Sequence, residues 1–187
     1  MKFKQTFGKY ACVGDTITTK VGKLTVTAEI VYDEDMGPPW KEHDGHGPVS
    51  DWERRKKRPG ERILSGSRFD SRRLYDVEEA TKIAKRDGWD SKPYKTGTEG
   101  QQAARAVEAD FQRMRAWCND EWTWVGVRLS VSKGGIVLDE HAASLWGIES
   151  DSNDFGDDNY DYLTEVANEL LPEAVKVGKT ALVELCS

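Results

Sequence analysis

Two of the three histidines, His43 and His46, lie three residues apart in a glycine-flanked segment with acidic neighbours, and His141 follows an acid in a later segment. Imidazole and carboxylate groups are the ligands that zinc and iron prefer in proteins. One hypothesis is therefore a metal-dependent hydrolase centred on His43, His46 and His141. The helical His-Glu-x-x-His spacing is missing, however, and a glycine-flanked loop histidine more often forms a simple hydrogen bond or faces solvent. The metal site stays an alternative.

Nucleophilic catalysis finds no support in the motifs. The chain has no Gly-x-Ser-x-Gly elbow, no P-loop and no Gly-x-Gly-x-x-Gly fingerprint. Its three cysteines, Cys12, Cys118 and Cys186, are widely spaced and form no Cys-x-x-Cys pair, which is typical of reduced thiols in a cytoplasmic protein. We therefore expect a binding protein rather than an enzyme, and no cofactor.

A basic stretch follows Trp52. Between Asp51 and Arg73 the chain carries nine Lys and Arg residues against four acids. Such a stretch can bind phosphates by releasing counterions, although a charge run is more often a solvated loop. The sequence thus offers direct DNA or RNA binding as an alternative function, through Trp52, Arg54, Arg55, Lys56, Lys57 and Arg58.

An acidic stretch occupies the C-terminal third. From Gly134 to Val175 there are eleven acids and no Lys or Arg, within a chain of net charge −6. A row of carboxylates can imitate a phosphate backbone and dock into a basic groove. The plainer interpretation is solubility, together with acids at 158–161 that are favourably placed near the start of a helix. We expect a partner-binding acidic face at Glu149, Asp151, Asp154, Asp157, Asp158, Asp161 and Glu165.

The elements that must position these groups follow from the hydrophobic patterns. Period-two alternation predicts strands at 16–21, 24–30 and 123–131, with a further strand within 4–13, short strands near 62–65 and 72–75, and returning strands at 136–138 and 143–149. Apolar stripes predict helices after Asp76, after Thr98 and from Leu163 onward, with Pro172 starting a new helix or kinking this one. The order favours an α+β fold with a mostly antiparallel sheet and about three helices packed against it.

The chain length of 187 residues suits one domain, here taken as 1–187, with a long Gly/Pro-rich basic loop at 34–61 and an acidic loop at 149–161. No window approaches the length of a membrane span, and the N-terminus lacks the apolar core of a signal peptide. We expect a cytoplasmic protein with no membrane contact.

Several segments resemble a family of short proteins encoded by bacteriophages and other mobile elements. They are His43–Trp52, Lys57–Glu61, Ile83–Asp90, Glu108–Phe111, Trp117–Asp120 and Ser144–Ser150, and the resemblance covers most of the chain. It implies an accessory protein acting inside a bacterial host, a class that often contains inhibitors of host defence such as anti-CRISPR and antirestriction proteins. No functional residue carries over from it.

The leading hypothesis combines charge and context. We expect a non-enzymatic accessory protein that binds and inhibits a host protein or ribonucleoprotein complex that handles nucleic acid, through an acidic, nucleic-acid-mimicking face. The sequence leaves a homo-oligomer open.

Overall fold

The computed structural model describes residues 1–67, 70–89, 97–152 and 161–185. Its backbone contacts divide the chain into two compact units: unit 1 comprises Met1–Met36 and Thr123–Ser187, and unit 2 comprises Gly37–Trp122. Unit 2 is thus a continuous insertion within the sequence of unit 1. The chain length predicts one domain over 1–187, whereas each unit here has its own hydrophobic core.

Unit 1 contains a four-stranded antiparallel sheet, sheet A, in the order β1-β2-β5-β6. The strands are β1 (Thr16–Val21), β2 (Leu24–Tyr32), β5 (Trp124–Lys133) and β6 (Ile136–Glu149). Two-residue turns join β1 to β2 and β5 to β6. In the second turn both Gly134 and Gly135 have positive φ, as the tight hairpin turn with matching twist requires.

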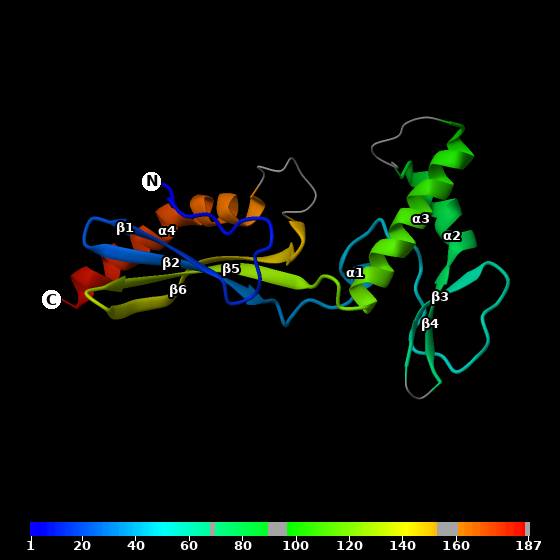
Figure 1. Cartoon of the computed structure of the whole chain (residues 1–187), viewed down its shortest axis with the longest axis horizontal. Helices are drawn as coiled ribbons and strands as arrows, with labels where there is room; N and C mark the ends of the chain where they lie inside the picture. Colours follow the sequence, from blue (N-terminus) through cyan, green and yellow to red (C-terminus); the bar gives the residue numbers. More distant parts are fainter. Residues whose placement is uncertain (68–69, 90–96, 153–160, 186–187) are drawn as a thin grey trace. The chain divides into compact units, whose positions relative to one another are not determined.

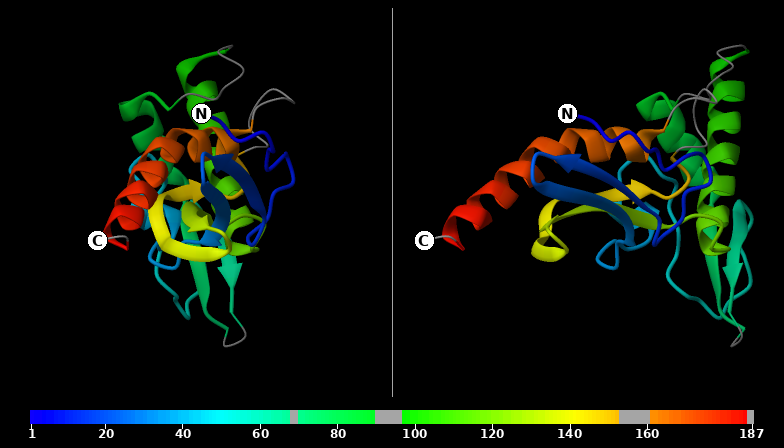
Figure 2. Two further views of the ribbon diagram at one scale, coloured as in Figure 1. Left: turned by 90° about the vertical axis from the view of Figure 1, so that its left-hand side faces the viewer. Right: turned by 60° about the vertical axis from the view of Figure 1, so that its left-hand side comes forward.

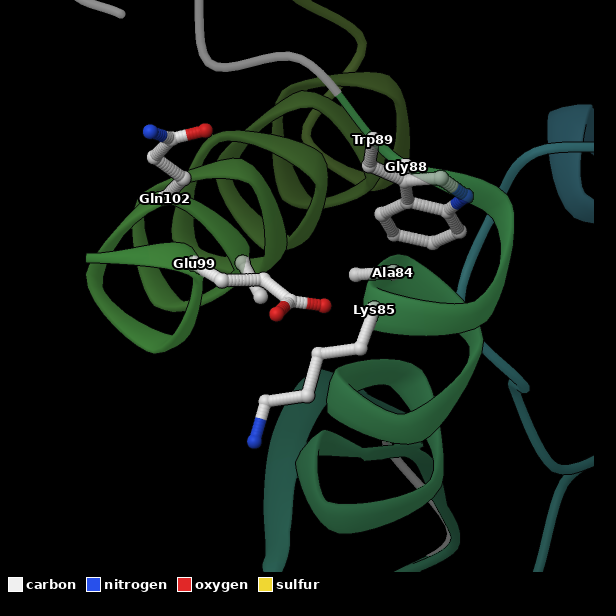
Figure 3. Close-up of a pocket in the computed structure, with 7 residues that line it drawn as sticks. Ala84, Lys85, Gly88, Trp89, Glu99 and Gln102 are labelled. Atoms are coloured by element: carbon white, nitrogen blue, oxygen red, sulfur yellow. The ribbon is translucent and has the colours of Figure 1, made fainter. Parts of the chain in front are cut away.

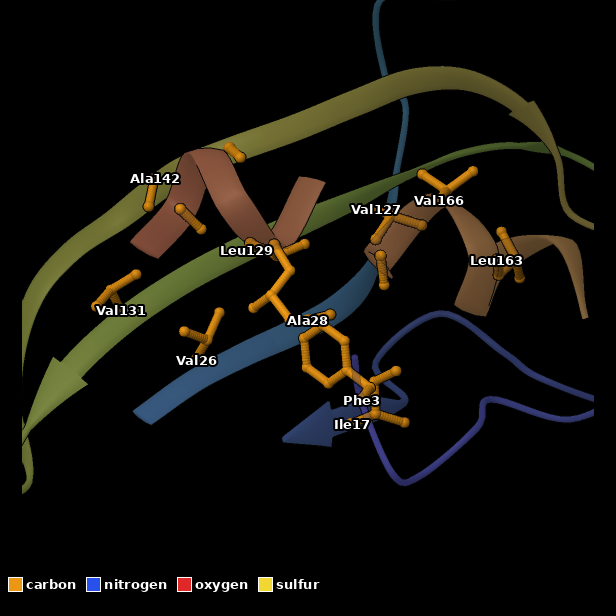
Figure 4. Close-up of a cluster of buried hydrophobic side chains, with 14 of the residues drawn as sticks. Phe3, Ile17, Val26, Ala28, Val127, Leu129, Val131, Ala142, Leu163 and Val166 are labelled. Atoms are coloured by element: carbon orange, nitrogen blue, oxygen red, sulfur yellow. The ribbon is translucent and has the colours of Figure 1, made fainter. Parts of the chain in front are cut away.

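One long helix, α4 (Tyr162–Glu184), covers one face of sheet A (Figures 1 and 2). Its apolar stripe packs on the alternate, inward-facing residues of β2 and β5, and Figure 4 shows Leu163 and Val166 beside this core. Asp161 caps the helix by accepting a hydrogen bond from the Thr164 N–H. The helix continues through Pro172, where the sequence allowed a new helix or a kink.

The strand expected within residues 4–13 is not formed, so this prediction is wrong. The segment instead runs beside the start of α4, whose side chains accept its backbone N–H groups. The Phe7 N–H donates to Thr164 Oγ1 (2.9 Å), and the Phe3 N–H, just before the segment, donates to Asn168 Oδ1 (2.7 Å). Because helix side chains satisfy these donors, the segment does not need a strand partner.

Unit 2 contains the two-stranded antiparallel sheet of β3 (Glu61–Gly66) and β4 (Arg72–Asp76). Its helices are the short α1 (Pro39–Glu42), α2 (Val77–Asp87) and α3 (Glu99–Cys118). Both long helices begin as the sequence predicts: Asp76 caps α2, and Thr98 forms a capping box with Gln101 at the start of α3. Residues 49–53 also pair with β4, through bridges at Val49 and Glu53.

These elements confirm the predicted α+β class with antiparallel strands. The core of unit 2 is built from Tyr75, Phe111, Met114 and smaller residues of α2 and α3. Within the part of the chain that the structure describes, no helix has both the length and the apolar composition needed to cross a bilayer.

Candidate functional site

Charge is divided between the two units. Unit 1 carries 9 Lys and Arg residues against 17 Asp and Glu residues, a net charge of −8, whereas unit 2 carries 18 against 16, a net charge of +2. The whole acid excess of the protein therefore belongs to unit 1. A surface of one sign attracts partners of the other sign and steers their association.

Within unit 1, acids from two distant segments come to one end of sheet A. Tyr32 at the end of β2 pairs with Val125 of β5, and Trp124 of β5 pairs with Glu149 at the end of β6. The residues that follow these strand ends, Asp33 to Asp35 and Asp151, therefore extend from the same end of the sheet. We call this group the acidic end: Asp33, Glu34, Asp35, Glu149 and Asp151.

The acids of the group differ in their environment. Asp33 is half-buried, and its carboxylate accepts hydrogen bonds from the backbone N–H groups of Gly147 (2.8 Å) and Asp35 (3.2 Å). Glu34 and Asp35 are exposed, and their carboxylates form no ion pair with any residue of the described ranges. Glu149 and Asp151 are half-buried. Two carboxylates in this group thus remain available to a partner.

Asp161, assigned to the partner-binding face, has the structural role that the plainer interpretation of the acidic stretch allowed, at the start of a helix. Its carboxylate accepts hydrogen bonds from the Thr164 N–H (3.0 Å), the Thr164 hydroxyl (2.8 Å) and the Gly8 N–H (2.8 Å). It therefore fixes the start of α4 and the N-terminal segment. Glu165, one turn on, is exposed. The other predicted members of the face, Asp154, Asp157 and Asp158, lie outside the described residues.

An open cavity of about 520 Å³ lies at the acidic end. Its walls include two exposed aromatic side chains, Tyr32 (58% exposed) and Trp146 (43% exposed), together with Met36. The acids Asp33, Glu34 and Asp35 complete the lining. The acidic end therefore combines a charged rim with apolar surface that a partner can cover.

In unit 2, the predicted basic stretch is an exposed loop. Arg54, Lys56, Lys57 and Arg58 face solvent and form no ion pair with the described residues. Arg55 differs, because its guanidinium binds both oxygens of Glu61 (2.6 and 2.7 Å) and also contacts Glu53. Arg55, together with the Arg58 N–H, lowers the pKa of Glu61 to about 2. Arg55 therefore holds the loop in place, and the other four bases can reach a ligand.

Trp52 forms a cation–π contact with Arg73, which also forms one with Trp40. The Arg73 guanidinium is 4.7 Å from the centre of the Trp52 ring and 5.2 Å from the centre of the Trp40 ring. Trp117 packs edge-on against Trp40, with 5.4 Å between ring centres. The exposed Trp52 (45%) is thus held beside an arginine next to the basic loop.

In the described part of the chain, His43, His46 and His141 do not form the metal site that the sequence offered as an alternative. Among the residues in the described ranges, no three His, Cys, Asp or Glu side chains are grouped so that they could hold a metal ion. His43 and His141 are exposed, and His46 Nδ1 lies 2.6 Å from Asp110 Oδ1. The reason is that α3 supplies a hydrogen-bond partner for His46, which the sequence spacing could not reveal.

Asp110 is the centre of a buried network in unit 2. Its second oxygen, Oδ2, accepts hydrogen bonds from the Tyr75 hydroxyl (2.6 Å) and the Gly47 N–H (2.8 Å). Only 8% of its side chain is exposed. Burial and the neighbouring carboxylate raise the pKa of Tyr75 well above its usual range. Through these contacts Asp110 connects the loop of His46 and Gly47 to β4 and α3. Asp110 therefore stabilises unit 2.

Cys118, in the described part of the chain, is not an activated nucleophile. Cys12 and Cys118 are free thiols, and burial raises the pKa of Cys118. A raised pKa keeps the thiol protonated and unreactive at neutral pH. Cys186 lies outside the described residues.

A smaller cavity, of about 250 Å³, lies between α2 and α3 (Figure 3). Trp89, Lys85 and Glu99 are among its lining residues. We assign this cavity no function.

Comparison of the chain with protein-family models, with curated proteins and with solved structures gives no match. The function is therefore inferred from the geometry of the site.

Residues 33–35 and Trp146 contribute to the acidic end, although neither was predicted from the sequence to belong to a site. A signal was present, because Asp33-Glu34-Asp35 is a run of three acids directly after a predicted strand. Only the pairing of β2 with β5 and of β5 with β6 brings this run next to Trp146 and Glu149.

Proposed function

We propose that this protein is a non-enzymatic binding protein that docks onto a basic, nucleic-acid-binding surface of a host protein or ribonucleoprotein complex and blocks it. The docking surface is the acidic end of unit 1. The observation that carries this proposal is the convergence of acids from two strand ends, more than 110 residues apart in the chain, beside exposed aromatic surface in a unit of net charge −8. The resemblance to mobile-element accessory proteins supplies the host context.

Electrostatics and exposure support the proposal together. Carboxylates presented beside apolar surface can replace phosphates in a basic groove while the apolar groups contribute contact area. Glu34 and Asp35 are exposed, and no described residue forms an ion pair with them that a partner would first have to break. Docking of this kind depends on ionic strength, because salt screens exposed charges.

The test is a binding assay with charge-neutralised protein. Tagged protein is incubated with nuclease-treated lysate of a bacterial host, and retained proteins are eluted with salt or with excess duplex DNA. In the test variant four acids are neutralised: Glu34→Gln, Asp35→Asn, Glu149→Gln and Asp151→Asn. The matched control changes the net charge equally in unit 2, through Asp44→Asn, Glu99→Gln, Asp120→Asn and Glu121→Gln.

We expect the wild-type protein and the control to retain a nucleic-acid-binding protein that DNA displaces, and the test variant to lose it. Equal retention by the test variant, or a captured partner that DNA does not displace, would contradict the proposal.

A second candidate function is direct nucleic-acid binding by the basic loop. The observation that favours it is the exposure of Arg54, Lys56, Lys57 and Arg58, four bases without an ion pair among the described residues, next to the exposed Trp52. Exposed bases bind phosphates by counterion release, and an exposed indole can stack on a base.

A mobility-shift assay separates this function from the first. Replacing the four bases with Gln should abolish a shift seen at low salt, while the same replacement of Lys2, Lys4, Lys20 and Lys23 in unit 1 should leave it. The slope of log affinity against log salt should fall by about one for each phosphate that the variant no longer neutralises. No shift with wild-type protein at low salt would exclude this function.

A further inference from the structure

We infer that the cavity at the acidic end binds an arginine side chain of the partner, with the guanidinium stacked on Trp146 or Tyr32 and paired with the carboxylates of Glu34 and Asp35. This inference rests on the proposed function and names the chemistry of its partner. Four features of the cavity support this inference. They are two exposed aromatic rings, an apolar methionine, two carboxylates without an ion pair in the described ranges, and the fixed position of one of the rings, Trp146.

Trp146 forms the fixed wall. It lies over Gly126 of β5, where a Cβ atom would overlap the indole ring. The flanking residues Val125 and Val127 belong to the core under α4, so Gly126 and the indole are on the opposite face of sheet A. The indole Nε1–H also donates to Ser144 Oγ (3.0 Å), which orients the ring. A residue without a side chain at position 126 thus makes room for an aromatic platform.

The acids are held beside this platform by the backbone. The Gly147 N–H, next to Trp146, donates to Asp33 Oδ2 (2.8 Å). Gly147 has a φ of 73°, a left-handed conformation that glycine adopts at little cost. Because the carboxylate of Asp33 is used in this contact, Glu34 and Asp35 are the acids left to pair with a ligand.

Aromatic faces and carboxylates together select a cation. The face of an indole or phenol ring carries negative electrostatic potential, which attracts a cation and disfavours an anion. Carboxylates at the rim act in the same direction. The volume of the cavity, about 520 Å³, is within the range of small-ligand sites and exceeds what a single hydrated ion needs.

Among cations, the cavity fits arginine better than lysine. A guanidinium is planar, is weakly hydrated, stacks on aromatic rings and can bind a carboxylate through two parallel hydrogen bonds. An ammonium group is a strongly hydrated point charge and has no flat surface to lay on an indole. Arginine is also the residue that basic nucleic-acid-binding grooves present most effectively to phosphates, in agreement with the proposed partner.

The experiment uses the full chain labelled with ¹⁵N. The probe is a peptide of Gly and Ser with one central arginine, and two matched peptides carry citrulline or lysine at that position. Citrulline has nearly the shape of arginine but no charge. The indole N–H signal of Trp146, one of seven tryptophans, is assigned from the spectrum of Trp146→Phe and followed during titration.

We expect the arginine peptide to shift the Trp146 signal with a millimolar dissociation constant, the lysine peptide to bind several-fold more weakly, and the citrulline peptide to cause no shift. Tyr32→Leu should weaken binding of the arginine peptide by about tenfold, the range of one desolvated cation–π contact. Trp52→Leu in unit 2 should have no effect. The amide spectrum of each variant shows whether it has folded.

In the titrations, each of these results would overturn the inference: no shift with the arginine peptide, equal binding of the citrulline peptide, or equal binding of the lysine peptide. A dimer in sedimentation that Trp146→Leu dissociates would also overturn it, because the occupant would then be a second copy of this chain. Failure here is distinct from failure of the proposed function, since Trp146→Leu keeps every carboxylate. A partner that the four-acid variant fails to retain but Trp146→Leu still binds would support the acidic end and reject the arginine cavity.

Discussion

Replacing Asp110 should destabilise unit 2 more than any other single acid-to-neutral change in that unit. The Asp110 carboxylate accepts three hydrogen bonds, from His46, the Tyr75 hydroxyl and the Gly47 N–H. Tyr75 is fully buried and Gly47 is buried, so water cannot replace the missing acceptor for either donor without opening the structure. His46 keeps partial exposure (22% of its side chain), and water can replace its partner.

The magnitude follows from the two buried donors. Each buried donor left without an acceptor costs about 1–3 kcal/mol, so Asp110→Ala should lower the free energy of unfolding by about 2–6 kcal/mol. Asp110→Asn keeps a carbonyl oxygen that can take the place of Oδ2 and accept from both buried donors, with its amide group toward the partly exposed His46, so its cost should be smaller, about 0.5–1.5 kcal/mol for the loss of charge. The matched control, Asp44→Asn, changes an exposed acid of the same unit and should stay within about 0.5 kcal/mol.

Two measurements check this order. Urea unfolding followed by tryptophan fluorescence reports mainly on unit 2, which holds five of the seven tryptophans. Hydrogen exchange of the Gly47 amide reports on the bond to Asp110 directly, and it should accelerate strongly in Asp110→Ala and less in Asp110→Asn, which keeps an acceptor oxygen. Unfolding of Asp110→Ala at the same urea concentration as Asp44→Asn, or unchanged Gly47 exchange in Asp110→Ala, would refute this role of Asp110.

Three further predictions concern packing and pH. At Gly178 of α4 an added Cβ would lie 2.5 Å from a valine methyl group of β5. Gly178→Val should therefore lower the free energy of unfolding in urea by about 1–3 kcal/mol. Gly100→Ala, at a position with open space around it, should not destabilise the protein. The pKa of Tyr75 is raised in the folded state, so the contribution of Tyr75 to stability is complete below the unfolded pKa of about 10 and is lost as pH rises. The urea midpoint should therefore fall less at alkaline pH in Tyr75→Phe than in the wild-type protein. An equal fall would contradict this prediction. Arg55 lowers the pKa of Glu61 to about 2, so the contribution of Glu61 to stability is complete above its unfolded pKa of 4.5 and is lost as pH falls toward 2. Glu61→Gln should therefore make the urea midpoint less dependent on pH in this acid range. A Glu61 carboxyl that titrates near pH 4.5 by NMR would contradict the lowered pKa.

The local elements were predictable from the sequence because each depends on neighbours within a few residues. Alternation in 24–30 and 123–131 marked β2 and β5, and the capping residues Asp76 and Thr98 marked the starts of α2 and α3. The strand expected within 4–13 failed because a distant helix supplies acceptors for its N–H groups. A local pattern contains no information about such a partner.

The candidate sites depended on contacts that no spacing rule contains. His46 suggested a metal ligand, but α3 places Asp110 beside it. Asp161 was assigned to the partner-binding face, but it caps α4. Arg55 lay in the basic run but is neutralised by Glu53 and Glu61. In each case the charge was evident from the residue type, and the fold supplied the partner.

The sequence by itself determined the fold class, most of the strands and helices, and the segregation of acids and bases along the chain, because composition and periodicity are local properties. Only the tertiary structure decided which charges meet. Strand register set Glu149 opposite Trp124 and brought residues 33–35 to the same end of the sheet, and the missing side chain of Gly126 made room for Trp146. The physical reason is that residues 33–35 and Glu149 are more than 100 positions apart, and their geometry is fixed by backbone pairing and close packing across the whole of unit 1.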